Sequence, residues 1–235
     1  MMDVITGKVN PSGRLNETYP IRHEDTPAFR NFPSTERNSE YRESLFIGYR
    51  YFDTSKVRVQ YPFGYGLSYT EFTYSDLKVT EEGAEFTLSN TGKRDGAEVA
   101  QMYVAAPKGK IFRPEKELKG FARVFLKAGE SKKVQIPFDD KTFRYWNTKT
   151  DRWEVEGGEY IICIGASVAD IRMSQDVQVE GTTEETPYSP EKMPSYFSGI
   201  VQNVPDEEFE ELLGHPIPSG KRAGGPGSND ATCQM

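Results

Sequence analysis

The chain has 235 residues, of which 36% are hydrophobic and 12% aromatic, and this content supports a folded core and excludes wholesale disorder. The formal net charge is −7, and the apolar runs, such as residues 160–166, fall far short of the ~20 residues of a membrane-spanning helix. We therefore expect no membrane and no nucleic-acid partner, because an acidic chain repels phosphates.

The first sixty residues do not predict a complete fold. Residues 2–7 indicate the last turn of a helix that ends at Gly7, and residues 10–20 a turn followed by a short extended piece. Residues 22–40 are polar and irregular, so we expect them to be mobile. Residues 45–52 are aromatic and predict a β-strand. We interpret residues 1–60 as the C-terminal remnant of a larger α/β domain, followed by a linker over residues 61–73.

From residue 74 to residue 180 the sequence shows short alternating strands separated by turns. Ala100 and Met102 share one face of their predicted strand, and Tyr160 and Ile162 share one face of another. The predicted strands cover residues 84–88, 98–104, 118–126, 134–138, 143–146, 153–155, 159–165 and 171–179. No helical periodicity interrupts them. This pattern predicts a mainly β fold, a fibronectin type III-like or immunoglobulin-like β-sandwich.

The remaining residues, 181–235, read as an acidic tail. Residues 181–214 contain eight acidic residues and one base, which indicates a solvated segment. One short helix is expected at about residues 205–213, ending at Gly214. Phe209, Leu212 and Leu213 share a face of that helix, which should therefore dock on another part of the chain. Residues 216–235 are expected to be disordered.

Metal and cofactor chemistry has no support in the sequence. His23 and His215 have no second ligand at metal-binding spacing, and no glycine-rich phosphate loop is present. Cys163 lies in an apolar run and reads as a buried hydrophobe, and Cys163 with Cys233 cannot form a disulfide framework. This favours a reducing, cytoplasmic compartment. A signal peptide upstream of a truncated N-terminus would instead indicate secretion.

Several strings, in order and at matching spacing over residues 3–180, resemble the C-terminal part of glycoside hydrolase family 3, of the β-glucosidase type. The most specific are Gly7–Leu15 (GKVNPSGRL) and Tyr61–Thr70 (YPFGYGLSYT). Further matching strings are Tyr51–Asp53, Glu117–Phe121, Ala128–Glu130, Tyr145–Asn147, Gly158–Tyr160 and Ile164–Ser167. Residues 207–218 also look like extensions seen on some anaerobic bacterial β-glucosidases of this family.

The resemblance implies an enzyme with a (β/α)8 barrel, an α/β sandwich and a fibronectin-like domain, which cleaves β-linked sugars with retention of configuration. Retention requires two carboxyl groups about 5–5.5 Å apart. In the family, the nucleophile is an Asp of the barrel and the usual acid/base is a Glu in the earlier part of the α/β sandwich. Neither segment matches this sequence, so we assign no catalytic, cofactor or metal residue. Some family members place the barrel after the fibronectin-like domain, so the domain order stays open.

Local acidic candidates do not change this assignment. Asp139 and Asp140 are adjacent, and neighbours on a strand point to opposite faces, so turn chemistry is the better interpretation. Glu40, Glu43 and Asp53 would lie near the absent domains, and we expect structural roles for them.

Two tryptophans flank a predicted hairpin. Trp146 and Trp153 offer either a sugar-stacking platform or a cross-strand aromatic pair, and we favour packing within the hairpin because such pairs stabilise sheets.

We hypothesise that the chain is a non-catalytic C-terminal fragment of a family 3 β-glycosidase. Its partners would be the barrel and the α/β sandwich, and β-linked oligosaccharides would be substrates of the complete enzyme only. The alternative is a free-standing carbohydrate-binding or adhesion module. Phe46, Ile47, Tyr49 and Tyr51 would lack their partner surface in a fragment, so we also expect a homodimer formed through residues 45–52.

Overall fold

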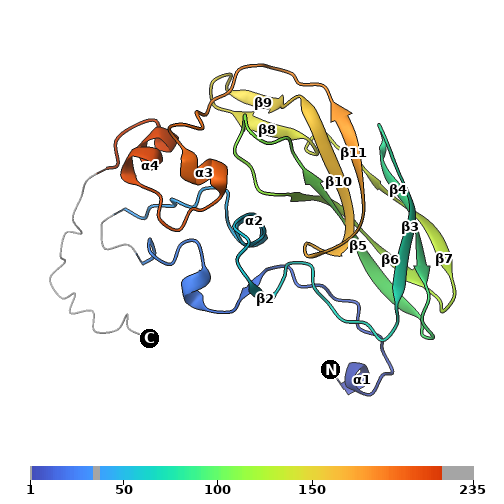
Figure 1. Ribbon diagram of the computed structural model, residues 1–235. Coiled ribbons are helices and arrows are strands. Elements are labelled where there is room, and N and C mark those ends of the chain that lie inside the picture. Colours follow the sequence, from blue (N-terminus) through green and yellow to red (C-terminus); the bar gives the residue numbers. More distant parts are fainter. Residues whose placement is uncertain (1, 34–37, 219–235) are drawn as a thin grey trace, which may run out of the picture.

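A computed structural model describes residues 2–33 and 38–218, and its largest part is a two-layer antiparallel β-sandwich (Figure 1). One sheet has the strand order β11-β10-β5-β6 and the other β3-β4-β7. The strands are β3 (Phe72–Thr80), β4 (Gly83–Asn90), β5 (Gly96–Ala105), β6 (Glu117–Leu126), β7 (Ser131–Pro137), β10 (Gly158–Ser167) and β11 (Asp170–Val179). The predicted mainly β, fibronectin-like fold is confirmed.

The sandwich core follows from alternation along the strands. Ala100 and Met102 of β5 lie on the inner face of their sheet together with Tyr160 and Ile162 of the neighbouring strand β10. They face the inner residues of β4 in the other sheet, among them Phe86, and all of these side chains are buried. The Tyr160 hydroxyl donates a hydrogen bond of 2.9 Å to the Glu156 carbonyl four residues upstream. This bond satisfies the polar end of a buried ring, as the tyrosine corner does in immunoglobulin-like sandwiches.

The predicted tryptophan hairpin is also present. Strands β8 (Arg144–Asn147) and β9 (Arg152–Val155) pair as a separate two-stranded sheet, with Trp146 directly opposite Trp153. In Figure 1 this hairpin lies over one end of the sandwich, next to β10 and β11.

The N-terminal segment is attached to the sandwich through the two most specific sequence strings. It carries α1 (Met2–Ile5), β1 (Tyr19–Pro20), a 3-10 turn (His23–Asp25), α2 (Tyr49–Thr54) and β2 (Val59–Tyr61), and β1 pairs with β2. The Asn10 side-chain oxygen accepts hydrogen bonds from the Tyr69 backbone N–H at 2.8 Å and the Ser68 hydroxyl at 3.1 Å. Arg14 forms a buried ion pair of 2.8 Å with Glu98 of β5. These contacts fix residues 10–14 of the N-terminal segment to residues 68–69 and to strand β5 of the sandwich.

Gly64 shows why the second string needs glycine. Its φ is +81°, and an added Cβ would lie 2.1 Å from the Gln101 Oε1 atom. Gln101 is buried, and its amide nitrogen donates to the Gly64 carbonyl at 3.2 Å and to the Ala166 carbonyl at 2.7 Å. A side chain at position 64 would displace this buried amide.

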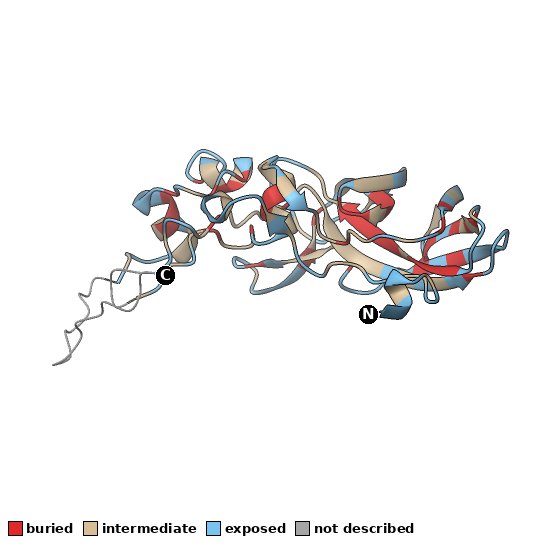
Figure 2. Ribbon diagram, turned by 90° about the horizontal axis from the view of Figure 1, so that it is seen from below, coloured by how far each residue is buried: buried red, intermediate tan, exposed pale blue. Residues whose placement is uncertain are grey.

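Residues 45–52 form a turn and a helix, so the predicted β-strand is wrong. Gly48, with φ +52°, precedes α2, and the Phe46 and Tyr51 side chains are 0% and 2% exposed. Packing overrides the β propensity of these aromatic residues, because both rings lie in a second hydrophobic cluster with residues from the tail. Figure 2 shows this second group of buried residues, in the helices, apart from the one in the strands.

The expectation of a solvated tail is wrong for the part of it that packs in this cluster. Helix α3 (Pro194–Ser198), which was not predicted, and helix α4 (Asp206–Leu213), which was, lie beside α2 (Figure 1). Phe209 is buried, and Leu212 and Leu213 pack against the same cluster, as predicted. Gly214 ends α4 in the left-handed conformation, with φ +74°.

Mobility of residues 22–40 and 216–235 stays a prediction, since residues 34–37 and 219–235 lie outside the described part. Within the described part, the Gln202 amide donates to the Glu24 carbonyl at 3.1 Å, and Arg30 donates to the Asn203 side chain at 2.7 Å. Among the residues described, no helix is long and apolar enough to cross a membrane.

Candidate functional site

The adjacent acids Asp139 and Asp140 serve a turn. The Asp139 carboxylate accepts hydrogen bonds from the Lys141 backbone N–H at 2.9 Å and the Thr142 hydroxyl at 3.0 Å, and these bonds lower its pKa although partial desolvation opposes them. Asp140 pairs with Arg144. The two carboxylates therefore have separate partners, as turn chemistry predicts.

The other acidic candidates lie at or near the second cluster, and they do not converge on a shared site. Glu40 pairs with Arg42 at 2.6 Å, and Asp53 pairs with Lys116 at 2.6 Å. Glu43 is 5% exposed, and its Oε2 atom has no hydrogen-bond partner among the described residues. Cys163 is buried, and burial raises the pKa of its thiol, while Cys233 lies outside the described residues.

Within the described residues no cluster of His, Cys, Asp or Glu has the geometry of a metal site. His23 stacks edge-on against Phe29, and the His215 ring contacts the Pro216 carbonyl, so neither histidine adjoins a set of ligands.

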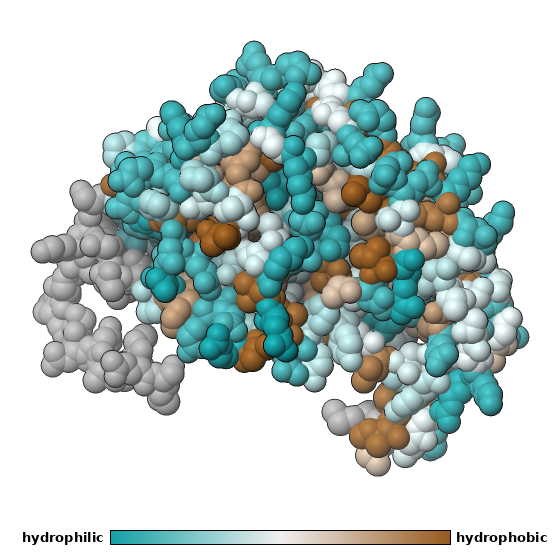
Figure 3. Space-filling view, in the orientation of Figure 1, coloured by the Kyte–Doolittle hydropathy of each residue, from teal (hydrophilic) through white to brown (hydrophobic). Residues whose placement is uncertain are grey.

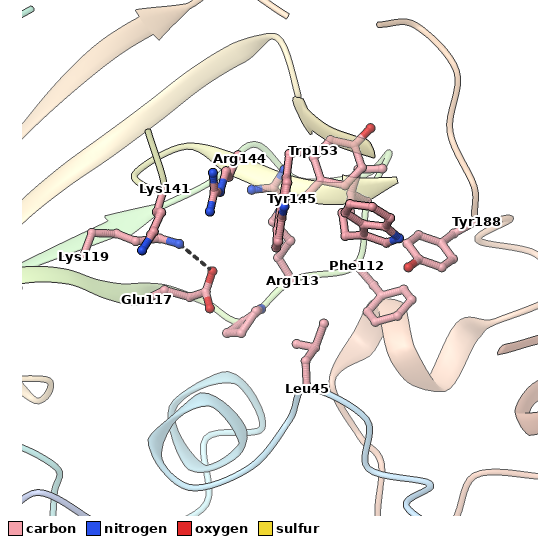
Figure 4. Close-up of a pocket in the computed structure, with 13 residues that line it drawn as sticks. Leu45, Phe112, Arg113, Glu117, Lys119, Lys141, Arg144, Tyr145, Trp153 and Tyr188 are labelled. Atoms are coloured by element: carbon pink, nitrogen blue, oxygen red, sulfur yellow. Dashed lines mark ion pairs between the residues drawn. The ribbon is translucent and has the colours of Figure 1, made fainter. Parts of the chain in front are cut away.

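A cavity of about 460 Å³ lies where the tryptophan hairpin, the loop between β5 and β6, and the tail meet. Figure 4 shows this cavity, with Arg144 and Trp153 from the hairpin on one side and Leu45 on the other. Phe112 of the β5–β6 loop and Tyr188 of the tail form its aromatic end, with ring centroids 4.5 Å apart.

The two tryptophans form the cross-strand pair that was predicted. Their ring centroids are 5.4 Å apart at an interplanar angle of 78°, an edge-to-face contact. The pair does not form one flat platform, yet Trp146 and Trp153 remain 43% and 53% exposed and both line the cavity. The Arg144 guanidinium lies 4.4 Å from the Trp153 ring centroid, a cation–π contact that fixes one face of that ring.

The charged residues that line the cavity are mostly basic. They are Arg113, Lys119, Lys141, Arg144 and Glu117. Glu117 is shared between Arg50, at 3.0 Å, and Lys119, at 3.4 Å. Arg113 lies 3.4 Å from Glu156, which does not line the cavity, and burial raises the pKa of Glu156 although Arg113 opposes that shift.

Sequence reasoning missed most of this cavity. The hairpin was predicted, but Phe112, Tyr188 and Leu45 come from segments that only tertiary packing brings together. Phe112 also stacks near Tyr196 of α3, at 5.3 Å. The aromatic content of residues 188–197 was an available signal that this part of the tail packs on the body of the chain, as the apolar face of the helix at residues 206–213 was for the part that follows.

Comparison with known proteins first defines the class of each part. Residues 98–168 match the fibronectin type III-like domain, and residues 1–69 match the glycosyl hydrolase family 3 C-terminal domain. The crystal structure of a family 3 beta-glucosidase from Bifidobacterium adolescentis is similar, with a TM-score of 0.74, 43% sequence identity, and coverage of 80% of this chain and 28% of that one.

Curated relatives agree with this class. Thermostable beta-glucosidase B of Acetivibrio thermocellus is 44% identical over 192 residues, covering 78% of this chain and 25% of the relative. The exo-alpha-(1->6)-L-arabinopyranosidase of Bifidobacterium longum is 44% identical over 192 residues, covering 80% and 25%. The chain belongs to glycoside hydrolase family 3, of which it carries the C-terminal part, and it spans about a quarter of the length of these relatives.

Proposed function

We propose that this chain is the non-catalytic C-terminal part of a retaining family 3 β-glycosidase, of the β-glucosidase type, and that it supports hydrolysis of O-glycosidic bonds only within the complete enzyme. The observation that carries this proposal is the extent of the similarity, which covers most of this chain but only 25% of thermostable beta-glucosidase B.

The state of the candidate carboxylates supports the proposal. A retaining glycosidase needs two carboxyl groups about 5–5.5 Å apart on either side of the scissile bond. Asp53 and Glu40 are held by Lys116 and Arg42, and Asp139 caps a turn. These groups are engaged in structural contacts.

An apolar surface on the N-terminal segment supports a partner role. Of the eighteen large hydrophobic side chains exposed among the described residues, twelve lie within residues 2–69. They are Met2, Ile5, Val9, Tyr19, Ile21, Phe29, Phe32, Tyr41, Ile47, Tyr61, Leu67 and Tyr69. Figure 3 shows apolar side chains along the edge of the molecule that carries this segment. Exposed apolar surface of this extent marks interaction sites, and the barrel and the rest of the α/β sandwich are the proposed occupants.

The homodimer through residues 45–52 stays a prediction. Phe46 and Tyr51 are buried in the second cluster, whereas Ile47 is 51% exposed and belongs to the partner surface proposed above.

The relatives' names bear on sugar specificity. A beta-glucosidase and an exo-alpha-(1->6)-L-arabinopyranosidase are equally similar to this chain, each at 44% identity. This supports sugar selection by parts of the enzyme outside the matched region.

Hydrolysis assays in two arms test the proposal. The purified chain alone should not hydrolyse aryl β-glucosides or β-xylosides. Co-expression with thermostable beta-glucosidase B from which the matched 192 residues have been removed should yield activity that this larger piece alone lacks. Turnover by the isolated chain that a single Asp or Glu substitution abolishes would contradict the proposal.

A matched pair of variants tests the surface. Tyr41→Glu places a charge on the proposed partner surface and should reduce recovered activity at least tenfold, whereas Phe125→Glu, on an exposed position of the sandwich, should leave it within twofold. Equal recovery with both variants would show that the N-terminal surface is not the partner surface.

A further inference from the structure

The cavity beside the tryptophan hairpin has the size and lining of a small-molecule site. Ligand pockets in proteins typically measure roughly 300–1,000 Å³ and combine aromatic walls with a few polar groups. This one measures about 460 Å³. Trp146 and Trp153 contact each other edge to face within the hairpin, and about half of each side chain remains exposed. Apolar ring surface is therefore open to a ligand.

The charge of the cavity favours an anion. The chain as a whole is acidic, at −7, yet four of the five charged residues lining the cavity are basic. Arg113 and Lys119 are paired with Glu156 and Glu117, so the positive charge open to a ligand comes from Lys141 and Arg144. Lys141 is exposed and forms no ion pair with any described residue. Arg144 pairs with Asp140, whose side chain is 72% exposed, and such water-screened pairs are weak, so this guanidinium can take a carboxylate in its place.

We propose that this cavity binds an acidic sugar, the uronic acid residue of an oligosaccharide. The carboxylate would lie between Lys141 and Arg144, and the apolar C–H face of the pyranose ring would pack on Trp146. Ring hydroxyls would donate hydrogen bonds to the Glu117 carboxylate. In Figure 4 the side chains of Lys141, Arg144 and Glu117 lie on one side of the cavity, and those of Trp153, Phe112 and Tyr188 lie on the other, as an amphipathic ring with one charge requires.

Other anions match the lining less completely. Inorganic phosphate would leave the aromatic wall without a contact. An aromatic acid would leave the Glu117 carboxylate facing a ring without hydrogen-bond donors, which is unfavourable for an acceptor-only group. The inference rests on the family assignment only for its choice of a carbohydrate, and it does not depend on whether the chain is catalytic.

Tryptophan fluorescence gives a direct test, because the chain contains two tryptophans and both line this cavity. The full chain is titrated with digalacturonate, with cellobiose, with benzoate and with inorganic phosphate. A saturable change with digalacturonate is expected, at an affinity at least tenfold higher than for each other probe, and it should weaken as salt is raised. No saturable change with digalacturonate, or equal or tighter binding of another probe, overturns the proposal.

A charge-matched pair of variants locates the site. Lys141→Glu should weaken digalacturonate binding at least tenfold and Lys141→Arg should retain it, whereas Lys127→Glu, the same change on an exposed residue outside the cavity, should stay within twofold. Circular dichroism verifies that each variant is folded. Equal weakening by both glutamate variants would show a non-specific charge effect and overturn the assigned site. None of these readouts involves hydrolysis, so they can fail or succeed independently of the proposed function.

Discussion

The two hydrophobic clusters of this protein are built in opposite ways. The sandwich core joins strands that follow one another in sequence or pair directly, such as β3 with β4 and β10 with β11. The second cluster joins Phe46 and Tyr51 to Tyr196 and Phe209, which lie near the other end of the chain, with Phe112 from the β5–β6 loop between them. Distant pairings, such as β5 with β10 and β4 with β7, complete the sandwich, but each of its strands carries its own alternating pattern. The comparison teaches that the strands are specified locally, whereas the helical part exists only because distant segments meet.

The largest effect is expected in the sandwich. Phe86→Ala removes a ring that is 2% exposed and stacks on Tyr74, so we expect the free energy of unfolding to fall by about 3–5 kcal/mol. We also expect both hydrophobic clusters to unfold in the same transition. Urea unfolding followed by circular dichroism measures this. The control is Phe121→Ala, at a residue 66% exposed, which should change stability by no more than about 0.5 kcal/mol. A sandwich that keeps its stability in Phe86→Ala would contradict the assigned core.

A smaller and local effect is expected in the second cluster. Phe209→Ala removes a buried ring that the tail contributes to the second cluster. The backbone amides of α2 and α3 should therefore exchange with solvent at least tenfold faster, while those of β5 and β10 keep their protection. Hydrogen exchange with mass spectrometry resolves the two regions. Ile200→Ala, at a residue 66% exposed in the same segment, is the matched control. Loss of protection throughout the chain would show that the two clusters unfold as one unit.

The smallest effect concerns the boundary between the clusters. Burial raises the pKa of Glu156 in the folded state, so as pH rises from the ordinary carboxyl range the unfolded chain ionises first and folding loses stability until the folded pKa is passed. The unfolding free energy of the native chain relative to Glu156→Gln should therefore fall with rising pH over that window. Paired urea titrations from pH 4 to 7 measure it. A difference that rises with pH would mean that Arg113 dominates and lowers this pKa.

The contrast between the clusters also explains what could be predicted from sequence. Period-two alternation placed Ala100, Met102, Tyr160 and Ile162 correctly in the sandwich core, because each strand carries its own pattern. The face of α4 that carries Phe209 was predicted for the same reason.

The predictions that were wrong concern residues whose packing partners lie far away in the sequence. Residues 45–52 have β-prone aromatics but form a helix beside α3, and nothing local to them signals a partner near residue 196. The high acidic content of the tail concealed its packing. Glu208, for example, is 7% exposed and accepts two hydrogen bonds of 2.8 Å from Ser195.

The construction of the second cluster has a consequence during protein synthesis. The aromatic segment that ends at Phe52 is synthesised about 140 residues before Met193, the first buried residue that the tail contributes to this cluster. At about 5–20 residues per second, this interval lasts roughly 7–28 seconds. Most strands of the sandwich are synthesised in that time, while Phe46, Tyr51 and Phe52 still lack the part of their cover that the tail supplies. Translation speed through the sandwich, and the chaperones present at the ribosome, therefore act most strongly on this short aromatic segment.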